Sequence, residues 1–319
     1  MQRAILTVLL YAVVLPVSAA PRPRDVILTT DSGTEIDDQW AIVYLLLSPG
    51  LNVKGVVTTH APNLAEPRSQ TSAACARAAL RRLEITSPPP VFAGSSVPLR
   101  ERQPLRNRGV DFMVETSRAY SPKNRLVILT IGATTDVASA LLADPTLGDP
   151  IEILTMGFNS WPRGTDDWNI RNDPLAYSVI LESRAPVTIG AGDVCRAHLK
   201  LSGTAADELL RGHGAVAEWL ADLFQDWITR NAESVAQAVG PQQWVIWDTI
   251  VVARLLGYTS SRRYPRPGLN TTDLTFLSGK TRRTIGWITA VDETRMWADF
   301  IAKLDKHRVS LAKPSGVTH

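Results

Sequence analysis

Acidic residues gather in one short segment near the start of the chain, where residues 29–41 read TTDSGTEIDDQWA. Asp31, Glu35, Asp37 and Asp38 place four carboxylates within eight positions. Carboxylates this close repel one another unless a cation lies among them or solvent separates them. The dipole of a helix that begins here offsets only about 0.3–1 kcal/mol per charge. Because hard divalent cations prefer such oxygen ligands, the segment predicts a metal site, with simple helix capping as the alternative.

Strands and helices must position these side chains, and the hydrophobic pattern indicates which ones. Apolar runs of strand length recur along the chain and are separated by segments with helical spacing. Continuous Val, Ile and Leu runs are typical of strands that are covered on both faces. We therefore expect an α/β fold, a single domain with a mostly parallel open sheet flanked by helices and built from Rossmann-type βαβ units. The runs cover residues 25–30, 53–59, 90–94, 125–132, 151–157 and 186–192.

The first unit is the clearest: strand 25–30, a helix over 37–47 and a strand ending at Thr59 form a βαβ crossover. Asp173-Pro174 predicts a helix N-cap followed by proline at the first helical position. Ligands of such sheets bind beyond the carboxyl ends of the strands. Polar residues that directly follow a strand are therefore the candidates for function.

The C-terminal third is expected to differ from this pattern. Helical spacing dominates residues 205–257, whereas residues 271–291 are typical of a small hairpin. A last amphipathic helix is predicted over residues 293–307. No repeat or linker divides the chain, so one domain is expected.

The segment from Asp31 to Asp38 resembles the signature of the inosine/uridine-preferring nucleoside hydrolase family, in which an Asp, a Gly and an Asp-Asp pair form half of a calcium site. Thr29 stands where the family usually has a further Asp, and Thr34-Glu35 is similar to a two-residue insertion. The resemblance continues in order along the chain. The similar segments are VVTTHAPN (56–63), ILTIGATTDVASAL (128–141), ILTMG (153–157), DWNIRNDPLA (167–176) and WVIWDTIVVA (244–253).

The resemblance implies calcium-dependent hydrolysis of the N-glycosidic bond of a ribonucleoside to ribose and free base. It also implies the Ca²⁺ ligands, which are Asp31, Asp37, Asp38, the backbone carbonyl of Ile131, and Asp248. Within this set Asp31 is the expected general base. Such hydrolysis passes through an oxocarbenium-like ribosyl cation, so a water molecule must be supplied on one face while the base departs from the other.

Ribose contacts are implied in the same way for Asp37, Asn63, Asp167 and Asn169. Judged singly, Asn169 could instead order its loop by a hydrogen bond, and Asp248 could be a helix N-cap.

Trp247 directly precedes Asp248, at a position where pyrimidine-tolerant members of the family carry His and purine-preferring members carry Trp. The resemblance therefore implies a purine preference, with Trp247 as a catalytic residue that stacks on the departing base. Trp161 and Trp168 are candidates for a second aromatic wall. The alternative for Trp247 is an ordinary core aromatic residue. Of the five histidines, only His60 lies next to a matched segment. A histidine general acid is therefore not expected.

The N-terminal residues predict export. A basic residue, an apolar stretch and Ser18-Ala19-Ala20 match a secretory signal over residues 1–19, ahead of a catalytic domain over residues 20–319. A periplasmic or secreted protein is expected, with no other membrane contact. Cys75 and Cys195 are either two free thiols or, in an oxidising compartment, one bridge.

Charge and composition limit the classes of molecule that the protein is expected to bind. Lys and Arg number 34 against 31 Asp and Glu, and both signs are scattered, which argues against nucleic-acid binding. The expected partner is a small-molecule nucleoside, and a homo-oligomer stays open.

Two alternatives to a nucleoside hydrolase remain at this point. The first is a related calcium-dependent glycosidase on another ribosyl or sugar compound. Two features leave the pocket for the leaving group unassigned: the insertion at Thr34-Glu35, and Arg108, which stands where the family often has a base-proximal His or Trp. The second is an exported calcium-dependent sugar-binding protein, although Asp31 favours an enzyme because a binder needs no base. A phosphatase would need a second Asp two residues from Asp31, where Thr29 and Gly33 stand.

Overall fold

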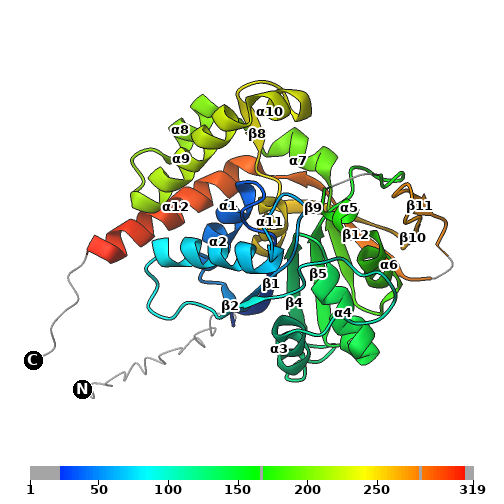
Figure 1. Cartoon of the computed structure of the whole chain (residues 1–319). Coiled ribbons are helices and arrows are strands. Elements are labelled where there is room, and N and C mark those ends of the chain that lie inside the picture. The colour runs from blue at the N-terminus through cyan, green and yellow to red at the C-terminus, as the bar shows by residue number, and fades with distance from the viewer. Residues whose placement is uncertain (1–21, 166–167, 280–281, 313–319) are drawn as a thin grey trace, which may run out of the picture.

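The computed structural model describes residues 22–165, 168–279 and 282–312 (Figure 1). The predicted signal segment and Asp167 lie outside these residues. A central sheet of eight strands runs in the order β3-β2-β1-β4-β5-β6-β12-β9, and all neighbours are parallel except β12 and β9. This confirms the predicted fold class. The strands are β1 (Arg24–Thr30), β2 (Leu51–Thr58), β3 (Val91–Ala93), β4 (Leu126–Ile131), β5 (Ile151–Met156), β6 (Val187–Gly190), β9 (Thr259–Pro265) and β12 (Thr284–Val291).

The central strands carry continuous apolar runs because helices cover both faces of the sheet. In β1, Val26 and Leu28 pack into one hydrophobic core and Ile27 into the other. Side chains along a strand alternate between faces, so a strand that is buried on both sides needs apolar residues at consecutive positions. This is why uninterrupted Val, Ile and Leu runs predicted these strands.

Two layers of helices form the cores (Figure 1). One core receives side chains from α1 (Asp37–Leu46), α2 (Arg68–Arg82), α11 (Thr249–Leu256) and α12 (Glu293–Ala312). The other receives them from α3 (Arg108–Ser117), α4 (Thr135–Ala143) and α6 (Pro174–Glu182). The short helices α5 (Trp168–Asn172) and α7 (Gly192–His198) follow β5 and β6.

The start of α6 confirms the predicted Asp-Pro cap. Asp173 accepts a hydrogen bond from the backbone N–H of Ala176 at 2.9 Å, with Pro174 at the first helical position. Its second carboxylate oxygen accepts from the N–H of Leu99 at 2.8 Å and from the hydroxyl of Thr135 at 2.6 Å. This buried carboxylate therefore has a structural role.

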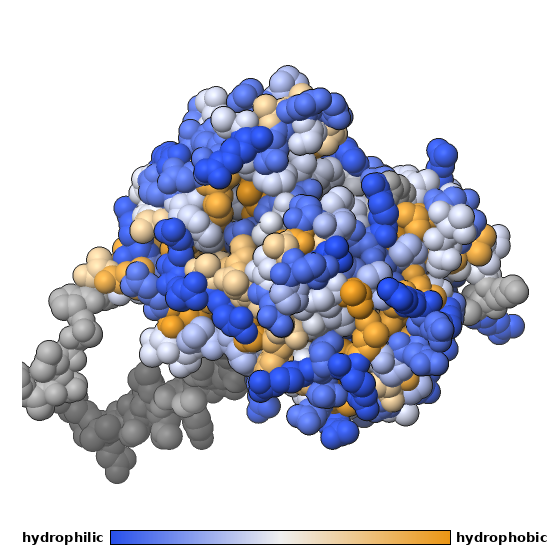
Figure 2. Space-filling view, viewed as in Figure 1, coloured by the Kyte–Doolittle hydropathy of each residue, from blue (hydrophilic) through white to orange (hydrophobic). Residues whose placement is uncertain are grey.

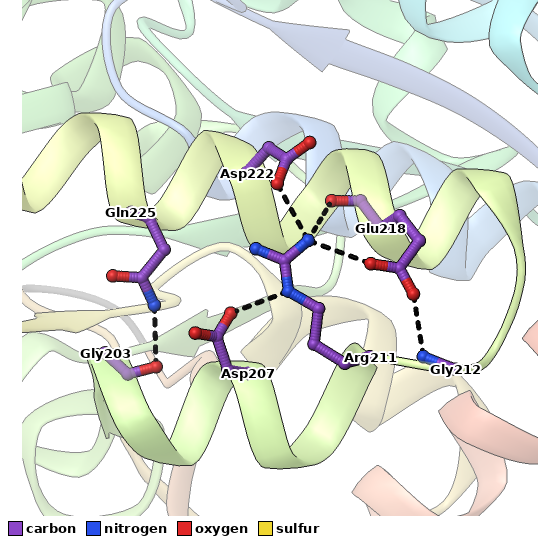
Figure 3. Close-up of polar contacts among 7 residues, drawn as sticks. All are labelled: Gly203, Asp207, Arg211, Gly212, Glu218, Asp222 and Gln225. Atoms are coloured by element: carbon purple, nitrogen blue, oxygen red, sulfur yellow. Dashed lines mark hydrogen bonds and ion pairs between the residues drawn. The ribbon is translucent and has the colours of Figure 1, made fainter.

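A group of helices extends beyond the sheet, comprising α8 (Gly203–Leu210), α9 (Ala215–Arg230) and α10 (Ala232–Ala238) (Figure 1). Arg211 joins α8 to α9: its guanidinium donates to Asp207 at 3.0 Å, Glu218 at 2.9 Å and Asp222 at 2.7 Å (Figure 3). All of these side chains are exposed.

Two short strands interrupt this helical part and were not predicted. β7 (Lys200–Ser202) pairs antiparallel with β8 (Gln243–Val245), which directly precedes the Trp247-Asp248 segment. Three-residue strands carry too little alternation to be recognised in a segment with helical spacing.

The C-terminal hairpin is larger than predicted. Its first strand is β9, and β10 (Gly268–Leu269) and β11 (Phe276–Leu277) form a small antiparallel pair in the connection to β12. The predicted range of 271–291 missed β9 because its sequence, TSSRRYP, is mostly exposed and lacks alternation. Helix α12 continues to Ala312, five residues beyond the predicted end.

The surface facing the viewer in Figure 2 is mostly hydrophilic, and hydrophobic residues form separate small patches on it. Within the described ranges, no helix combines the length and apolar character needed to cross a membrane. Cys75 on α2 and Cys195 on α7 are both free thiols, so the structure shows no bridge between them. Cys75 accepts a hydrogen bond from Gln39 at 3.2 Å, and burial raises the pKa of its thiol to about 11.

Candidate active site

The predicted carboxylates converge at the carboxyl end of the sheet. Asp31 directly follows β1, Asp37 and Asp38 begin α1, and Asp248 directly precedes α11, which packs against α1. One carboxylate oxygen from each of Asp37, Asp38 and Asp248 can be chosen so that the three atoms lie within 4.8 Å of one another. None of the four side chains is more than 4% exposed. Segments more than 200 residues apart in sequence thus form one buried acidic group.

Local structure explains how the first three side chains reach this position. The N–H of Thr34 donates to the carbonyl of Asp31 at 3.3 Å and closes a turn in which Gly33 has a φ of +101°. Such a φ favours glycine because it strains residues with a Cβ. The hydroxyl of Thr30, at the end of β1, donates to the carboxylate of Asp38. The loop after β1 thereby turns its acidic residues toward the sheet edge.

Gly132, which follows β4, leaves room for Asp31. A Cβ at this position would lie 2.8 Å from both the backbone nitrogen and Oδ1 of Asp31. Any other residue would therefore displace the Asp31 backbone or side chain. The preceding residue, Ile131, lines the same cavity as Asp31.

Asp248 occupies the N-cap position of α11, but its side chain makes no capping hydrogen bond. The capping alternative for this residue is therefore not supported. At the start of α1 the N-cap residue is Ile36, which also makes no side-chain cap.

The pKa values of the three carboxyl groups are raised, mainly by burial. Burial raises the pKa of Asp37 to about 6. Burial and then the charges of Asp31 and Asp37 hold the pKa of Asp38 well above its ordinary value. Burial and the charges of Asp37, Asp38 and Asp31 do the same for Asp248. The group therefore resists ionisation unless a cation lies among the oxygens.

These residues fit a metal ion. Among the described residues, no Lys, Arg or His forms an ion pair with Asp37, Asp38 or Asp248. Buried carboxylates without a cationic partner cost several kcal/mol in a folded protein. Oxygen donors at this spacing are the ligands of a hard divalent cation. The acidic group can therefore hold a metal.

A cavity of about 320 Å³ opens above the acidic group. Most of the site residues predicted from the sequence lie on its wall. They are Asp31, Asp37, Asp38, Ile131, Asn169, Trp247 and Asp248.

The predicted ribose-binding residues are placed differently from one another. Asn169 on α5 is buried, and its side-chain amide donates to the carbonyl of Met156 at 3.3 Å. Asn63 is exposed, donates to the carbonyl of Thr34 at 3.2 Å, and does not line the cavity. Asn63 thus steadies the loop that carries the inserted Thr34-Glu35. Asp167 lies outside the described residues.

Three tryptophans line the cavity: Trp168, Trp244 and Trp247. Trp244 meets Trp247 edge to face, with ring centroids 6.4 Å apart. Trp161, the other candidate for an aromatic wall, is instead stacked on Tyr264 of β9 with centroids 4.4 Å apart. Trp161 therefore packs against the C-terminal hairpin and does not line the cavity.

His60 and Arg108 also lie away from the cavity wall. His60 is buried, and its Nε2 lies 2.9 Å from the hydroxyl oxygen of Thr135. Burial lowers the pKa of His60 to about 4. Arg108 lies over the ring of Phe92 at 5.9 Å and lines a separate depression at the β3 edge of the sheet. Neither residue is positioned to contact a molecule in the cavity.

Several residues of the cavity wall were not predicted, among them Asn159, Trp244 and Arg196. The guanidinium carbon of Arg196 lies 4.8 Å from the centroid of the Trp247 ring, and its Nη1 donates to Oδ1 of Asn159 at 3.2 Å. Both residues follow predicted strands, β5 and β6. The rule that ligands bind beyond the carboxyl ends of strands could have identified them.

The fold and the site define a class of α/β enzymes in which an acidic group that can hold a metal and several tryptophans line one cavity. A sequence profile described as inosine-uridine preferring nucleoside hydrolase matches residues 26–298, and the chain belongs to this family. This confirms the resemblance, makes the protein an N-glycosyl hydrolase, and favours an enzyme over a sugar-binding protein.

Solved structures show the same fold. A purine-preferring ribonucleoside hydrolase from Gardnerella vaginalis aligns with a TM-score of 0.74 and 22% identity over 89% of this chain and 99% of its own. A plant nucleoside hydrolase aligns with a TM-score of 0.71 and 18% identity, over 89% of this chain and 99% of its own. The inosine-uridine preferring nucleoside hydrolase from Bacillus anthracis aligns with a TM-score of 0.66 and 16% identity, over 89% of this chain and 99% of its own. A comparison with curated proteins gives no match.

Proposed function

We propose that this protein hydrolyses the N-glycosidic bond of purine ribonucleosides to ribose and free base, with Ca²⁺ at the acidic group. The observation that carries the proposal is the composition of one cavity. Buried carboxylates and tryptophans line the same cavity. A ribose with vicinal hydroxyls suits the first, and a planar base suits the second.

Calcium would be held by Asp31, Asp37, Asp38 and Asp248, together with the backbone carbonyl of Ile131. Five protein ligands approach the six to eight oxygens that this ion prefers, and substrate hydroxyls and water would complete the set. When bound, the ion supplies positive charge that orients the ribose hydroxyls and activates water.

The side chains of this chain perform the remaining steps. Asp31 accepts a proton from the attacking water, whose oxygen forms the new bond to C1′. The C1′–N bond breaks, and its electron pair leaves with the base. Asp37 accepts a hydrogen bond from a ribose hydroxyl, and Asn169, held by its bond to Met156, contacts the same sugar. Asp167 would join them as a further ribose ligand.

A purine preference rests on the aromatic wall. Trp247 adjoins the ligand Asp248 and is accompanied by Trp168 and Trp244. Stacking of a base on an aromatic ring is worth about 1–3 kcal/mol in nucleic-acid complexes, and a purine offers the larger surface. The purine-preferring description of the Gardnerella vaginalis structure accords with this assignment.

A ribose-release assay tests the function. Inosine, guanosine, adenosine, uridine and cytidine are compared with calcium and with excess chelator. We expect cleavage of the purine ribonucleosides, which chelator abolishes and added calcium restores. Absence of ribose release from every nucleoside in the panel would refute the proposal, and release that is unaffected by chelator would refute the role of the metal.

The Trp247→Ala variant tests the purine preference. The ratio of kcat/KM for inosine to that for uridine should fall by about tenfold, because losing about 1–3 kcal/mol of stacking affects the larger base more. Trp227→Ala is the matched control, since Trp227 belongs to the same aromatic cluster but does not line the cavity. Equal or better cleavage of uridine by the wild type contradicts the preference.

A further inference from the structure

Arg196 lies over the ring of Trp247 and lines the same cavity. Arg196 comes from α7, which follows β6 at the carboxyl end of the sheet. Its guanidinium lies over the Trp247 ring at 4.8 Å and donates to Asn159 at 3.2 Å. Two contacts from different elements therefore hold the guanidinium at the cavity wall.

Gly192, in the first turn of α7, makes room for this arrangement. A Cβ there would lie 2.8 Å from Oδ1 of Asn159 and 3.2 Å from Nη1 of Arg196. The backbone of α7 thus approaches the pair of side chains as closely as the absence of a Cβ allows.

The guanidinium of Arg196 has N–H donors beyond the one that Asn159 receives. A guanidinium carries five N–H donors in a planar fork, and Asn159 uses one of them. Among the described residues, no carboxylate lies within ion-pair distance of Arg196, and Asp193 on the same helix interacts with it electrostatically at longer range. The residue is exposed and lines the cavity, so a molecule in the cavity can receive the remaining donors.

The acidic group and the guanidinium of Arg196 lie beside two adjacent residues of the cavity wall, Asp248 and Trp247. The carboxylates of Asp37 and Asp38 lie beside Asp248, whereas the guanidinium of Arg196 lies over Trp247. In the proposed function, the ring of Trp247 faces the base. When the C1′–N bond breaks, the electron pair stays on the base, which becomes negative unless it is protonated. A group that stabilises charge developing in the transition state accelerates the reaction.

We propose that Arg196 is a catalytic residue that stabilises the departing base, donating hydrogen bonds to O6 and N7 of a 6-oxopurine. This inference rests on the proposed function and extends it to a substrate class. The bonding pair of C1′–N moves onto the purine, the anion is held by the guanidinium, and it then takes a proton from solvent. The guanidinium acts only as a hydrogen-bond donor and gives up no proton.

The shape of the guanidinium selects the base. Its fork matches two neighbouring acceptors, and O6 with N7 is the pair that arginine reads in guanine. Hypoxanthine carries the same pair, whereas adenine presents an amino donor in place of O6. Inosine and guanosine are therefore the expected substrates, ahead of adenosine.

The experiment compares two ribosides that differ in how much help the leaving group needs. Inosine releases a poor leaving group, whereas 4-nitrophenyl β-D-ribofuranoside releases a phenolate that is already stable. In Arg196→Gln we expect kcat for inosine to fall by about 10²-fold, as for the loss of a transition-state donor. The rate with the nitrophenyl riboside should stay within about threefold of wild type, because that step needs no such donor.

Arg196→Lys keeps the charge without the fork, so its inosine rate should lie between those of the other two proteins, and its preference for inosine over adenosine should be reduced. Arg82→Gln is the matched control, because Arg82 lies over the Trp219 ring at 5.3 Å, away from the cavity. Its rates should equal those of wild type. Unchanged melting temperatures show that the variants are folded.

The possible outcomes separate the two proposals. Wild-type cleavage of neither riboside overturns the proposed function and the inference together. Wild-type activity with an unchanged inosine rate in Arg196→Gln overturns the inference alone. Equal losses of kcat on both ribosides also overturn it, because Arg196 would then act without regard to the leaving group. A wild-type preference for adenosine overturns it because adenine lacks the O6 acceptor.

Discussion

Two groups of three carboxylates in this molecule differ in what balances their charge. Asp207, Glu218 and Asp222 surround Arg211 on the outside of α8 and α9, with side chains 40%, 41% and 68% exposed (Figure 3). Asp37, Asp38 and Asp248 are 4%, 1% and 4% exposed and have no ion-pair partner among the described residues. The first group is compensated within the protein and the second is not.

The two groups shift pKa values in opposite directions. Hydrogen bonds from Arg211 lower the pKa of Glu218, whereas burial raises that of Asp37 to about 6. Exposed ion pairs contribute about 0–1 kcal/mol each to stability. Buried ionised carboxylates destabilise the fold, so they must either keep a proton or be compensated by an external cation. The same residue types thus serve as a surface link in one place and as a metal site in the other.

The largest contrast between the groups should appear in catalysis. Asp31→Asn removes the proposed base beside the buried group, and kcat should fall by about 10²–10⁴-fold. Asp222→Asn makes the same chemical change in the surface group and should leave kcat unchanged. Both are measured as ribose release from inosine. A rate above about a tenth of wild type for Asp31→Asn would place the base elsewhere.

Metal removal should separate the groups by stability. At a calcium concentration about 100 times its dissociation constant, binding adds about 2.7 kcal/mol, which corresponds to roughly 5 °C in melting temperature for a domain of this size. Chelator should remove this increment from the wild type and from Arg211→Ala. Asp248→Asn should melt at nearly the same temperature with and without calcium. An equal calcium response in Asp248→Asn would contradict the assigned ligands.

The pH dependence of the metal-free protein should follow the raised pKa of Asp37. The folded state holds a proton that the unfolded state releases between the ordinary value of 3.8 and about 6. The unfolding free energy in chelator should therefore fall as pH rises through this window. Urea unfolding at pH 4, 5 and 6 measures the slope, which Asp37→Asn should reduce. A slope that is identical in both proteins argues against this titration.

The smallest effect is expected at the surface group. Arg211→Ala removes three exposed contacts that share one guanidinium, and the unfolding free energy should fall only slightly because solvent screens each of them. Added salt should weaken the contribution because exposed charges are screened. Urea unfolding at low and high salt gives both quantities. A loss of several kcal/mol would mean that the surface group supports the fold as strongly as a buried network does.

Much of the fold could be predicted from the sequence, because strands buried on both faces leave a continuous apolar pattern. All six predicted strands are present, and the Asp173 cap begins α6 as expected. The edge strand β9 and the three-residue strands β7 and β8 were missed. Their residues are exposed or too few to alternate, so local pattern does not distinguish them from loops or helices.

The sequence by itself determined the family and the acidic segment, because Asp31, Asp37 and Asp38 lie close together along the chain and their mutual repulsion can be inferred without coordinates. Only the tertiary structure decided what meets them. It brings Asp248 to their oxygens, places Arg196 over Trp247, and moves Trp161 to the hairpin. Such contacts join segments tens to hundreds of residues apart, and they depend on the order of strands in the sheet, which a local pattern does not contain.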